Sequence, residues 1–274
     1  EEAAIARDIA LAADAGAHLH ISQVSTAGGV ALIRAAKERG VRVTAEVTPH
    51  HLTLTDRWVM GALQPREPQA EKPPRKGRRN PIPELGLPSW LDPTLLPPYD
   101  PSTRVSPPLR TQADVEALIE GLRDGTIDAI ATGHAPHALV DKACEYRLAA
   151  PGISGLETAL ALVLTLVHRG ELDLVDLVAK LTEGPAQVLG RAPATLRPGA
   201  RADLVIFDPE AVWTVDAEAF ASLGRNTPLH GQRLKGQVML TMAGGEVVFR
   251  RDGFGRNAAD QPAPSRLDGI LEGQ

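Results

Sequence analysis

One apolar run that stops at a histidine-rich turn constrains the fold of this chain most. Residues 127–131 read Ile-Asp-Ala-Ile-Ala, and residues 132–137 continue as Thr-Gly-His-Ala-Pro-His. A short, mostly apolar run bounded by turn residues is typical of a buried strand in a parallel sheet. In barrels built from such strands, the side chains that do chemistry follow the carboxyl ends of the strands. We therefore expect this strand end to border a functional site.

The rest of the first half alternates between helical and strand patterns. Apolar residues recur at helical spacing in residues 1–15 and 30–36, whereas residues 17–25 and 41–48 alternate as strands do. Thr111 stands as an N-cap before a helical pattern that ends at Gly125. Two further apolar helices are expected at 156–169 and 172–182. This order of helices and strands predicts a parallel α/β sheet over residues 1–61 and 98–190.

A proline-rich stretch interrupts this pattern. Thirteen prolines lie from Pro65 to Pro108, so neither helix nor sheet can propagate there. Six basic residues lie among the prolines: Arg66, Lys72, Arg75, Lys76, Arg78 and Arg79. We interpret residues 62–97 as a disordered, solvated insertion, with docking of an acidic partner as the alternative.

The final third has a different character. After Gly190, short strand patterns separated by turn residues occur at 202–207, 212–215, 237–242 and 246–249. They predict a small β module over 191–250. Residues 251–274 are polar and rich in glycine and proline, so we interpret them as a flexible tail.

Charge and composition exclude several classes of partner. A net charge of −5 and a pI near 5.9 argue against binding to nucleic acid or to an anionic membrane. The single cysteine, Cys144, cannot form an internal disulfide, and no cationic leader precedes an apolar stretch at the start. No apolar run reaches the roughly 18 residues that a membrane span needs. We therefore expect a cytoplasmic protein.

Five motifs occur in the order in which the second half of the bacterial dihydroorotases carries them. They are residues 18–26 (HLHISQVST), 44–52 (TAEVTPHHL), 107–111 (PPLRT), 128–137 (DAIATGHAPH) and 155–158 (GLET). The chain resembles this family, which belongs to the amidohydrolase superfamily, everywhere except in the insertion and the tail. Hydantoinases and allantoinases share the layout, but not the His-Ala-Pro-His ending.

The resemblance implies a fold and an activity. The fold is a partial (β/α)8 TIM-type barrel, with strands six to eight and their helices, plus a small carboxyl-terminal β module. The family reaction is the reversible, zinc-dependent hydrolysis of dihydroorotate to carbamoyl-aspartate in de novo pyrimidine biosynthesis. The family centre holds one or two zinc ions. This chain begins just before the sixth strand, so the resemblance implies that the ligands of earlier strands are absent from it.

Three family positions carry altered residues. Gln23 stands where the family has a zinc-ligating histidine, and Gly133 stands where it has the aspartate general base. Ser106 replaces an asparagine that grips the substrate. A glutamine amide is a neutral, weak zinc ligand, and removal of a general base costs on the order of 10²–10⁴ in rate. We therefore expect this chain alone to bind no zinc and to be non-catalytic.

Some substrate-side residues remain. His137 matches a histidine that contacts the substrate from the eighth-strand loop, and Pro151 and Gly152 match the backbone segment that lines the pyrimidine ring. The alternative is structural: His137 caps a turn and the Pro-Gly pair fixes a loop.

Three other histidines have competing interpretations. His20 is expected to point into the barrel wall, with recruitment as a substitute ligand as the alternative. His50 and His51 follow a strand end, where a structural role is expected.

Three hypotheses remain open at this point. The leading one is a non-catalytic dihydroorotase homologue, for which aspartate transcarbamoylase is the expected partner. The second is an active dihydroorotase or related cyclic amidase that another chain completes. The third is an interaction module that uses the basic insertion. A half-barrel exposes unpaired strand edges, so we expect it to need a complementing chain, self-association or a rearrangement that the family does not show.

Overall fold

The computed structural model describes residues 1–63 and 91–254. The chain divides into two compact units: the first comprises Glu1–Ala194 and Pro209–Gln237, and the second comprises Thr195–Asp208 and the chain from Val238 onward. The basic cluster of the predicted insertion and most of the predicted tail lie outside the described residues. Within the described part, no helix is both long and apolar enough to cross a bilayer.

A three-stranded parallel sheet organises the first unit. Its strands are β1 (Leu19–Ile21), β2 (Val43–Val47) and β3 (Ala129–Ile130), hydrogen-bonded in that order. Buried and half-buried residues alternate along β2, so one face of the strand carries apolar side chains and the other carries Thr44 and Glu46. The parallel sheet expected from the sequence is confirmed, with shorter strands than predicted.

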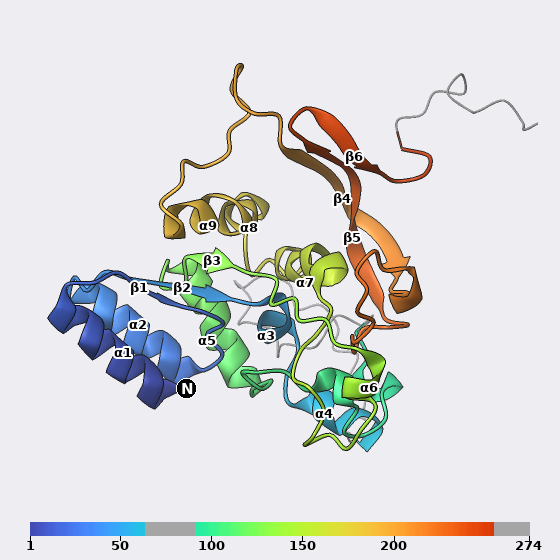
Figure 1. Ribbon diagram of the computed structural model, residues 1–274, viewed down its shortest axis with the longest axis horizontal. Helices are drawn as coiled ribbons and strands as arrows, with labels where there is room; N and C mark the ends of the chain where they lie inside the picture. Colours follow the sequence, from blue (N-terminus) through green and yellow to red (C-terminus); the bar gives the residue numbers. More distant parts are fainter. Residues whose placement is uncertain (64–90, 255–274) are drawn as a thin grey trace, which may run out of the picture. The chain divides into compact units, whose positions relative to one another are not determined.

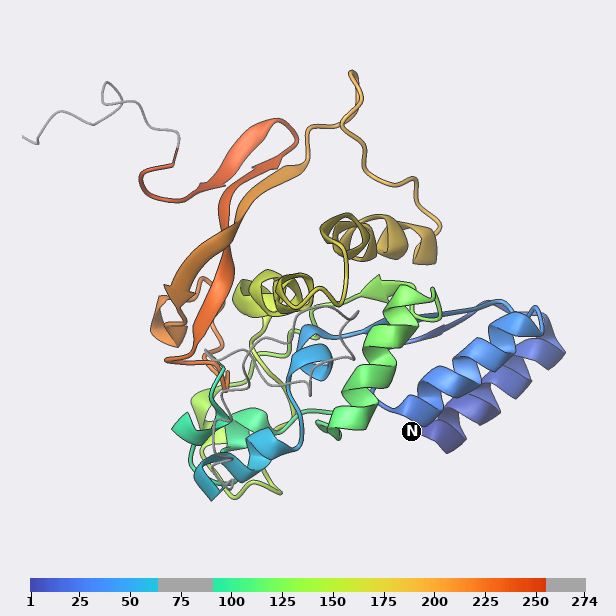
Figure 2. The ribbon, with the colours of Figure 1, turned by 180° about the vertical axis from the view of Figure 1, so that it is seen from behind.

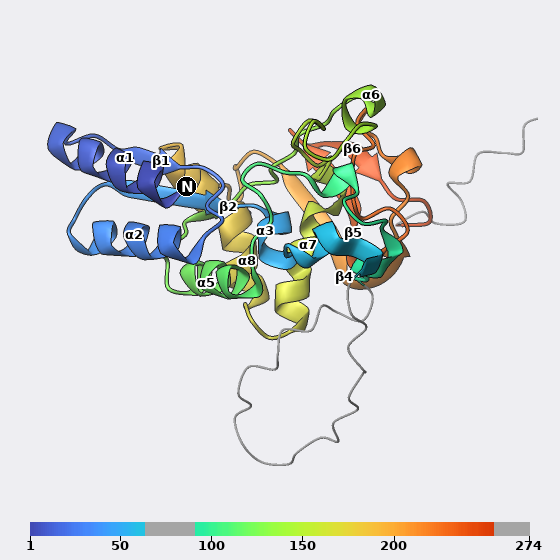
Figure 3. The same ribbon diagram turned by 90° about the horizontal axis from the view of Figure 1, so that it is seen from below.

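Three helices form a row in which each contacts the next. They are α1 (Glu2–Ala15), α2 (Ala27–Glu38) and α5 (Gln112–Arg123), seen together in Figure 1 and from below in Figure 3. Each buries an apolar stripe at helical spacing, as Val115, Leu118 and Leu122 do on α5. Thr111 caps α5 in a capping box with Asp114, as the sequence predicts.

The core of the unit surrounds α7 (Leu156–His168), of which eight residues are buried. The short helix α3 (Pro49–Thr53) packs against α7, which Figure 2 shows from behind. The next helix, α4 (Arg57–Met60), inserts the fully buried Trp58 into a cluster with Leu162 and Leu234. Burial of each such side chain contributes about 1.5–3 kcal/mol.

The helix expected at 172–182 is α8 (Leu174–Leu181). A second short helix, α9 (Glu183–Val188), follows it and was not predicted. Pro185 lies in the first turn of α9, where the lack of a backbone N–H is tolerated. Gly184 is required there, because a Cβ would lie 2.1 Å from the carbonyl oxygen of Asp128. The first turn of α9 therefore lies directly against β3.

Short turns complete the first unit. They are η1 (Gly61–Leu63), η2 (Pro93–Leu95), η3 (Pro101–Thr103), α6 (Leu139–Lys142) and η4 (Ala217–Ala219). Residues 91–97, at the end of the predicted insertion, are partly packed: Leu91 and Pro93 are buried, whereas Asp92, Leu95 and Pro97 are exposed. The amide side chain of Gln232 bonds both the backbone N–H and the carbonyl of Asp92.

The β module contains fewer and longer strands than expected. It consists of β4 (Leu204–Thr214), β5 (Arg233–Ala243) and β6 (Glu246–Arg250), in the order β4, β5, β6, with β5 and β6 antiparallel. The two strands predicted at 202–207 and 212–215 are one strand that runs through Pro209. Among the described strands β4 lies at an edge of its sheet, where a proline leaves no ladder bond unmade.

Candidate functional site

The predicted site residues follow the carboxyl ends of the three parallel strands. Gln23 comes after β1, His50 and His51 open the helix after β2, and Gly133 and His137 come after β3. Because the strands are parallel neighbours, these ends lie along one edge of the sheet. The local structure at each end decides what chemistry is available there.

Gln23 occupies a strained backbone position at the end of β1. Its φ is 56°, in the left-handed region that few residues other than glycine adopt, and its side chain is half-buried. Beyond it, the carboxylate of Glu1 accepts bonds from the backbone N–H groups of Ser25 (2.8 Å) and Thr26 (3.1 Å) and forms an ion pair with Arg110. The loop that carries Gln23 is therefore held by a charged anchor.

Burial raises the pKa of the Glu1 carboxyl, but the hydrogen bonds from Ser25 and Thr26 and the charge of Arg110 outweigh it. The net pKa of Glu1 is lowered from its usual value of 4.5. The anchor is thus favoured in its charged form.

The two histidines after β2 are structural in their contacts. Thr48 caps α3, and its hydroxyl lies 2.7 Å from Nδ1 of His51. Nε2 of His51 lies 3.0 Å from the carbonyl oxygen of Pro107, which only accepts, so Nε2 carries the proton and Nδ1 accepts from Thr48. The rings of His50 and His51 are 4.6 Å apart. Burial, followed by the neighbouring His51, lowers the pKa of His50 well below 6.5.

Gly133 has a conformation and surroundings that suit only glycine. Its φ is +59°, and a Cβ there would lie 2.7 Å from Cγ2 of Thr48 and 2.8 Å from Cε1 of His50. Distances this short require neighbouring atoms to move. The imidazole of His50 therefore fills the space that a side chain at position 133 needs, and no group that could carry a proton projects from this position.

Three of the four remaining predicted substrate-side residues, His137, Pro151 and Gly152, form one loop cluster. Nε2 of His137 lies 3.1 Å from the carbonyl oxygen of Pro151, so the imidazole packs against the Pro151–Gly152 segment. The backbone of Gly152 lies close to the segment after β3, since a Cβ at this position would lie 2.6 Å from Cβ of Ala135 and 2.8 Å from Nε2 of His137. Ser106 is exposed. His137, Pro151 and Gly152 are thus brought together.

Two residues that sequence reasoning missed hold this loop cluster. Asn226 is 8% exposed and bonds the backbone of both segments, and Lys142 is 6% exposed and donates to the carbonyl oxygens of Arg104, Ala150 and Gly152. Burial, and to a smaller extent Arg104, lowers the pKa of Lys142 to about 8. Asn226 lies more than 70 positions from its partners along the chain, so no local pattern marks it.

The described side chains do not fit a zinc ion. Across residues 1–63 and 91–254, no three His, Cys, Asp or Glu side chains gather to hold a metal. His20 contacts two neighbouring side chains, with Nδ1 2.9 Å from the hydroxyl of Thr44 and Nε2 3.4 Å from the carboxylate of Glu46. The amide of Gln23 and the bare backbone of Gly133 add no anionic donor.

Two of the pockets that the described residues of the first unit line differ in their position relative to the predicted site. One, of about 760 Å³, lies beside the loop cluster and is lined by His137, Lys142 and Asn226 among others. Its volume is in the range of small-molecule sites. The other, of about 540 Å³, is lined by Arg123 of α5 and by Asp176 and Lys180 of α8.

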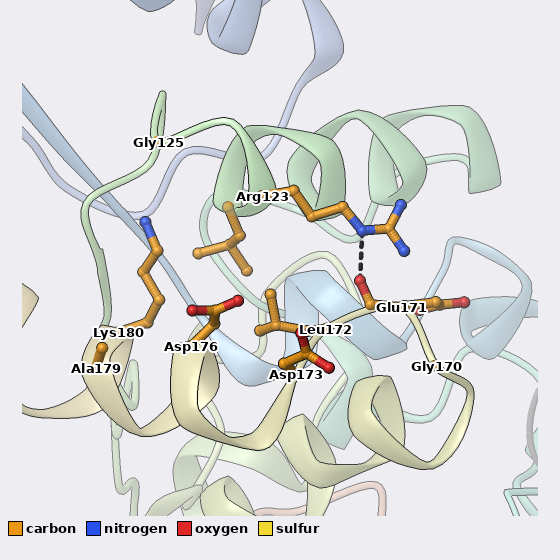
Figure 4. A pocket seen from close by; sticks show the side chains of 10 residues that line it. Arg123, Gly125, Gly170, Glu171, Leu172, Asp173, Asp176, Ala179 and Lys180 are labelled. Atoms are coloured by element: carbon orange, nitrogen blue, oxygen red, sulfur yellow. Dashed lines mark hydrogen bonds between the residues drawn. The ribbon is translucent and has the colours of Figure 1, made fainter.

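Figure 4 shows the second pocket, with Arg123 reaching over the α7–α8 turn to donate to the carbonyl oxygen of Glu171. Gly125 lines this pocket and precedes β3, and Lys180 donates to the carbonyl oxygen of Ile127. The pocket therefore lies at the amino end of β3, away from residues 133–137. In barrels this end serves stability rather than chemistry.

Known proteins match the chain over most of its length. The amidohydrolase family matches residues 1–248. The dihydroorotase of Syntrophus aciditrophicus is 46% identical over 252 residues, which are 92% of this chain and 50% of that protein. The dihydroorotase of Pelotomaculum thermopropionicum is 49% identical over 251 residues, 91% of this chain and 50% of that protein.

A solved structure supports the same relationship. The L-hydantoinase (dihydropyrimidinase) of Arthrobacter aurescens superposes with a TM-score of 0.73 at 30% identity, over 91% of this chain and 48% of that chain. The chain thus spans about half the length of the curated relatives it matches. Its parallel sheet is a fragment of a (β/α)8 barrel, with a small antiparallel sheet near the carboxyl terminus. The chain belongs to the amidohydrolase family, in which it is a partial, dihydroorotase-like member.

Proposed function

We propose that this chain is a non-catalytic dihydroorotase-like protein that retains part of the substrate-side surface. The family reaction opens a cyclic amide with an activated water, a carboxylate that takes and returns its proton, and groups that hold the substrate. In this chain the positions of a metal ligand and of the general base carry Gln23 and Gly133. The loop cluster around His137 and Gly152 is intact by contrast.

The observation that carries this proposal is the packing at Gly133. A lost aspartate alone would leave a gap beside the strand end. Here the backbone adopts φ +59° and the imidazole of His50 occupies the space of a Cβ. The surroundings have therefore adapted to the loss, which favours a role that does not need proton transfer at this position.

We propose that this protein acts as a scaffold for a partner enzyme. The expected partner is aspartate transcarbamoylase, which supplies the carbamoyl-aspartate that the family cyclises in pyrimidine biosynthesis. The high identity to dihydroorotases supports the choice of pathway. Co-expression of the two proteins, followed by size-exclusion chromatography, tests it: a shared peak is expected, and separate elution at micromolar concentrations contradicts it.

A second candidate is a hydrolase that another polypeptide completes, acting on dihydroorotate or on a hydantoin. The 30% identity to an L-hydantoinase and the retained loop cluster favour it. Adding a polypeptide with the front half of the family fold, together with zinc, tests this candidate. Ring opening of dihydroorotate in the mixture would overturn the non-catalytic proposal.

The most direct experiment is metal analysis of the purified chain together with an assay of dihydroorotate turnover. We expect less than stoichiometric zinc after dialysis, and no turnover above that of the buffer. A tightly held, stoichiometric metal together with ring opening would refute the proposal.

A further inference from the structure

Asn226 connects two segments that are distant in sequence and adjacent in space. Its Oδ1 accepts from the backbone N–H of His137 (2.9 Å) and from the hydroxyl of Ser154 (2.7 Å). Its Nδ2 donates to the carbonyl oxygens of Ala135 and Gly152, each at 3.0 Å. The amide has two donor hydrogens and two acceptor lone pairs, and all four are used.

The two segments also contact each other directly. The residues after β3 form a parallel bridge with those before α7, between His134 and Ile153. The N–H of Ala135 donates to the carbonyl oxygen of Ile153 at 2.8 Å. Side chains add to this bridge: Nδ1 of His134 accepts from the N–H groups of Gly155 (3.1 Å) and Leu156 (3.3 Å), and Nε2 of His137 lies 3.1 Å from the carbonyl oxygen of Pro151. The Asn226 amide adds four further hydrogen bonds, two to each segment, and so holds both segments at once.

Lys142 completes the support on the side of Gly152. Its Nζ lies 3.1 Å from the carbonyl oxygen of Gly152, so this oxygen has two donors, Lys142 and Asn226. A carbonyl oxygen has two lone pairs, and both are then occupied. The peptide plane after Gly152 is therefore fixed by two buried side chains from different parts of the chain.

We propose that Asn226 is a positioning residue that sets the surface which His137 and the Pro151–Gly152 segment present to a cyclic ureide ligand. Asn226 itself has no group left to bind a ligand, so it acts through these two segments. The identity of the ligand rests on the proposed function, whereas the positioning role rests on the contacts alone. Loss of the amide removes the hydrogen bonds that Asn226 makes to the N–H of His137 and the carbonyl of Ala135, and leaves the carbonyl of Gly152 with Lys142 as its donor.

The test compares Asn226→Ala with Gln232→Ala in the full chain. Gln232 is a matched control, because it is a buried amide in the same unit that bonds two backbone groups of another loop, the N–H (2.8 Å) and carbonyl (2.7 Å) of Asp92. Asn226→Asp is the conservative variant: its carboxylate still accepts from His137 but no longer donates to Ala135 and Gly152.

Two properties of each variant are measured under conditions in which the variants are equally stable, as judged from their denaturation midpoints. Hydrogen exchange is followed at the backbone amides of residues 135–137 and 152–154, and dihydroorotate binding is followed by calorimetry. For Asn226→Ala we expect exchange there to accelerate by at least about 10-fold and binding to weaken by at least about 10-fold, the ratio that corresponds to about 1.4 kcal/mol. Asn226→Asp should show the same pattern, whereas Gln232→Ala should change neither readout.

The outcomes separate the two proposals. Equal acceleration of exchange in these segments by Asn226→Ala and Gln232→Ala would overturn the positioning role, as would unchanged binding in an Asn226 variant whose segments exchange faster. If the wild-type chain does not bind dihydroorotate, the proposed ligand is wrong, and the exchange comparison alone decides the positioning role.

Discussion

Replacing Gly133 with alanine tests whether Thr48 and His50 leave space for a side chain at this position. The left-handed φ of +59° costs an alanine about 1–2 kcal/mol. The Cβ also meets Thr48 and His50 at 2.7 and 2.8 Å, and overpacking of this kind costs about 1–3 kcal/mol. Gly133→Ala should therefore lower the free energy of unfolding by about 2–5 kcal/mol.

Gly125 supplies the control for the backbone contribution. Its φ is +80°, and a Cβ there meets nothing within 4 Å, so Gly125→Ala reports the conformational cost without the clash. Urea unfolding of both variants gives the difference, expected at about 1–3 kcal/mol, and a thermal melt should show it as about 2–12 °C in Tm. Equal destabilisation by the two substitutions would show that the space at position 133 is open and would refute the argument from His50.

Three further predictions concern the strand ends and the helix row. Because burial and His51 lower the pKa of His50, the unfolded chain takes up a proton near pH 6.5 that the folded chain does not. The free energy of unfolding should therefore decrease below about pH 6.5, with His50 contributing up to about 1.4 kcal/mol per pH unit; His50→Asn should make this slope shallower in urea titrations, and an unchanged slope would contradict a buried, neutral imidazole. Thr111→Ala removes the cap of α5 and should cost about 1 kcal/mol in the same assay; no change would mean that the capping box is not formed in solution. Gln23→His introduces a metal-ligand type at a backbone position that histidine tolerates, yet with too few neighbouring donors among the described residues, so zinc retention after dialysis should stay below stoichiometric.

Local sequence patterns predicted the parallel sheet and its helix row. The apolar run at β3, the N-cap at Thr111 and the stripe on α5 are short-range signals, and the structure follows them. The interpretation was wrong at 202–215, where two strands were expected and the structure has one. Pro209 lies within this strand, at the edge of its sheet, where a proline is tolerated.

For the candidate site, the sequence predicted where the residues lie relative to the strands but not which side chains contact them. The resemblance places Gln23, Gly133 and His137 at strand ends, and the structure puts them there. It gives no indication that His50 fills the space beside Gly133, because this contact depends on a backbone φ that sequence does not reveal. Asn226 is likewise invisible to pattern reasoning: its four partners come from residues 135–154, and only the folded chain brings them to it.

The Glu1 carboxylate has a practical consequence for anyone who shortens or fuses this polypeptide. It ties helix α1 to the turn that carries Gln23, through Ser25, Thr26 and Arg110. A truncation or fusion that removes the Glu1 side chain would free the turn that carries Gln23, more than twenty positions downstream. The increased mobility of that turn would then be mistaken for a property of the site. Comparisons between versions of the protein are therefore sound only when that glutamate is kept in each of them.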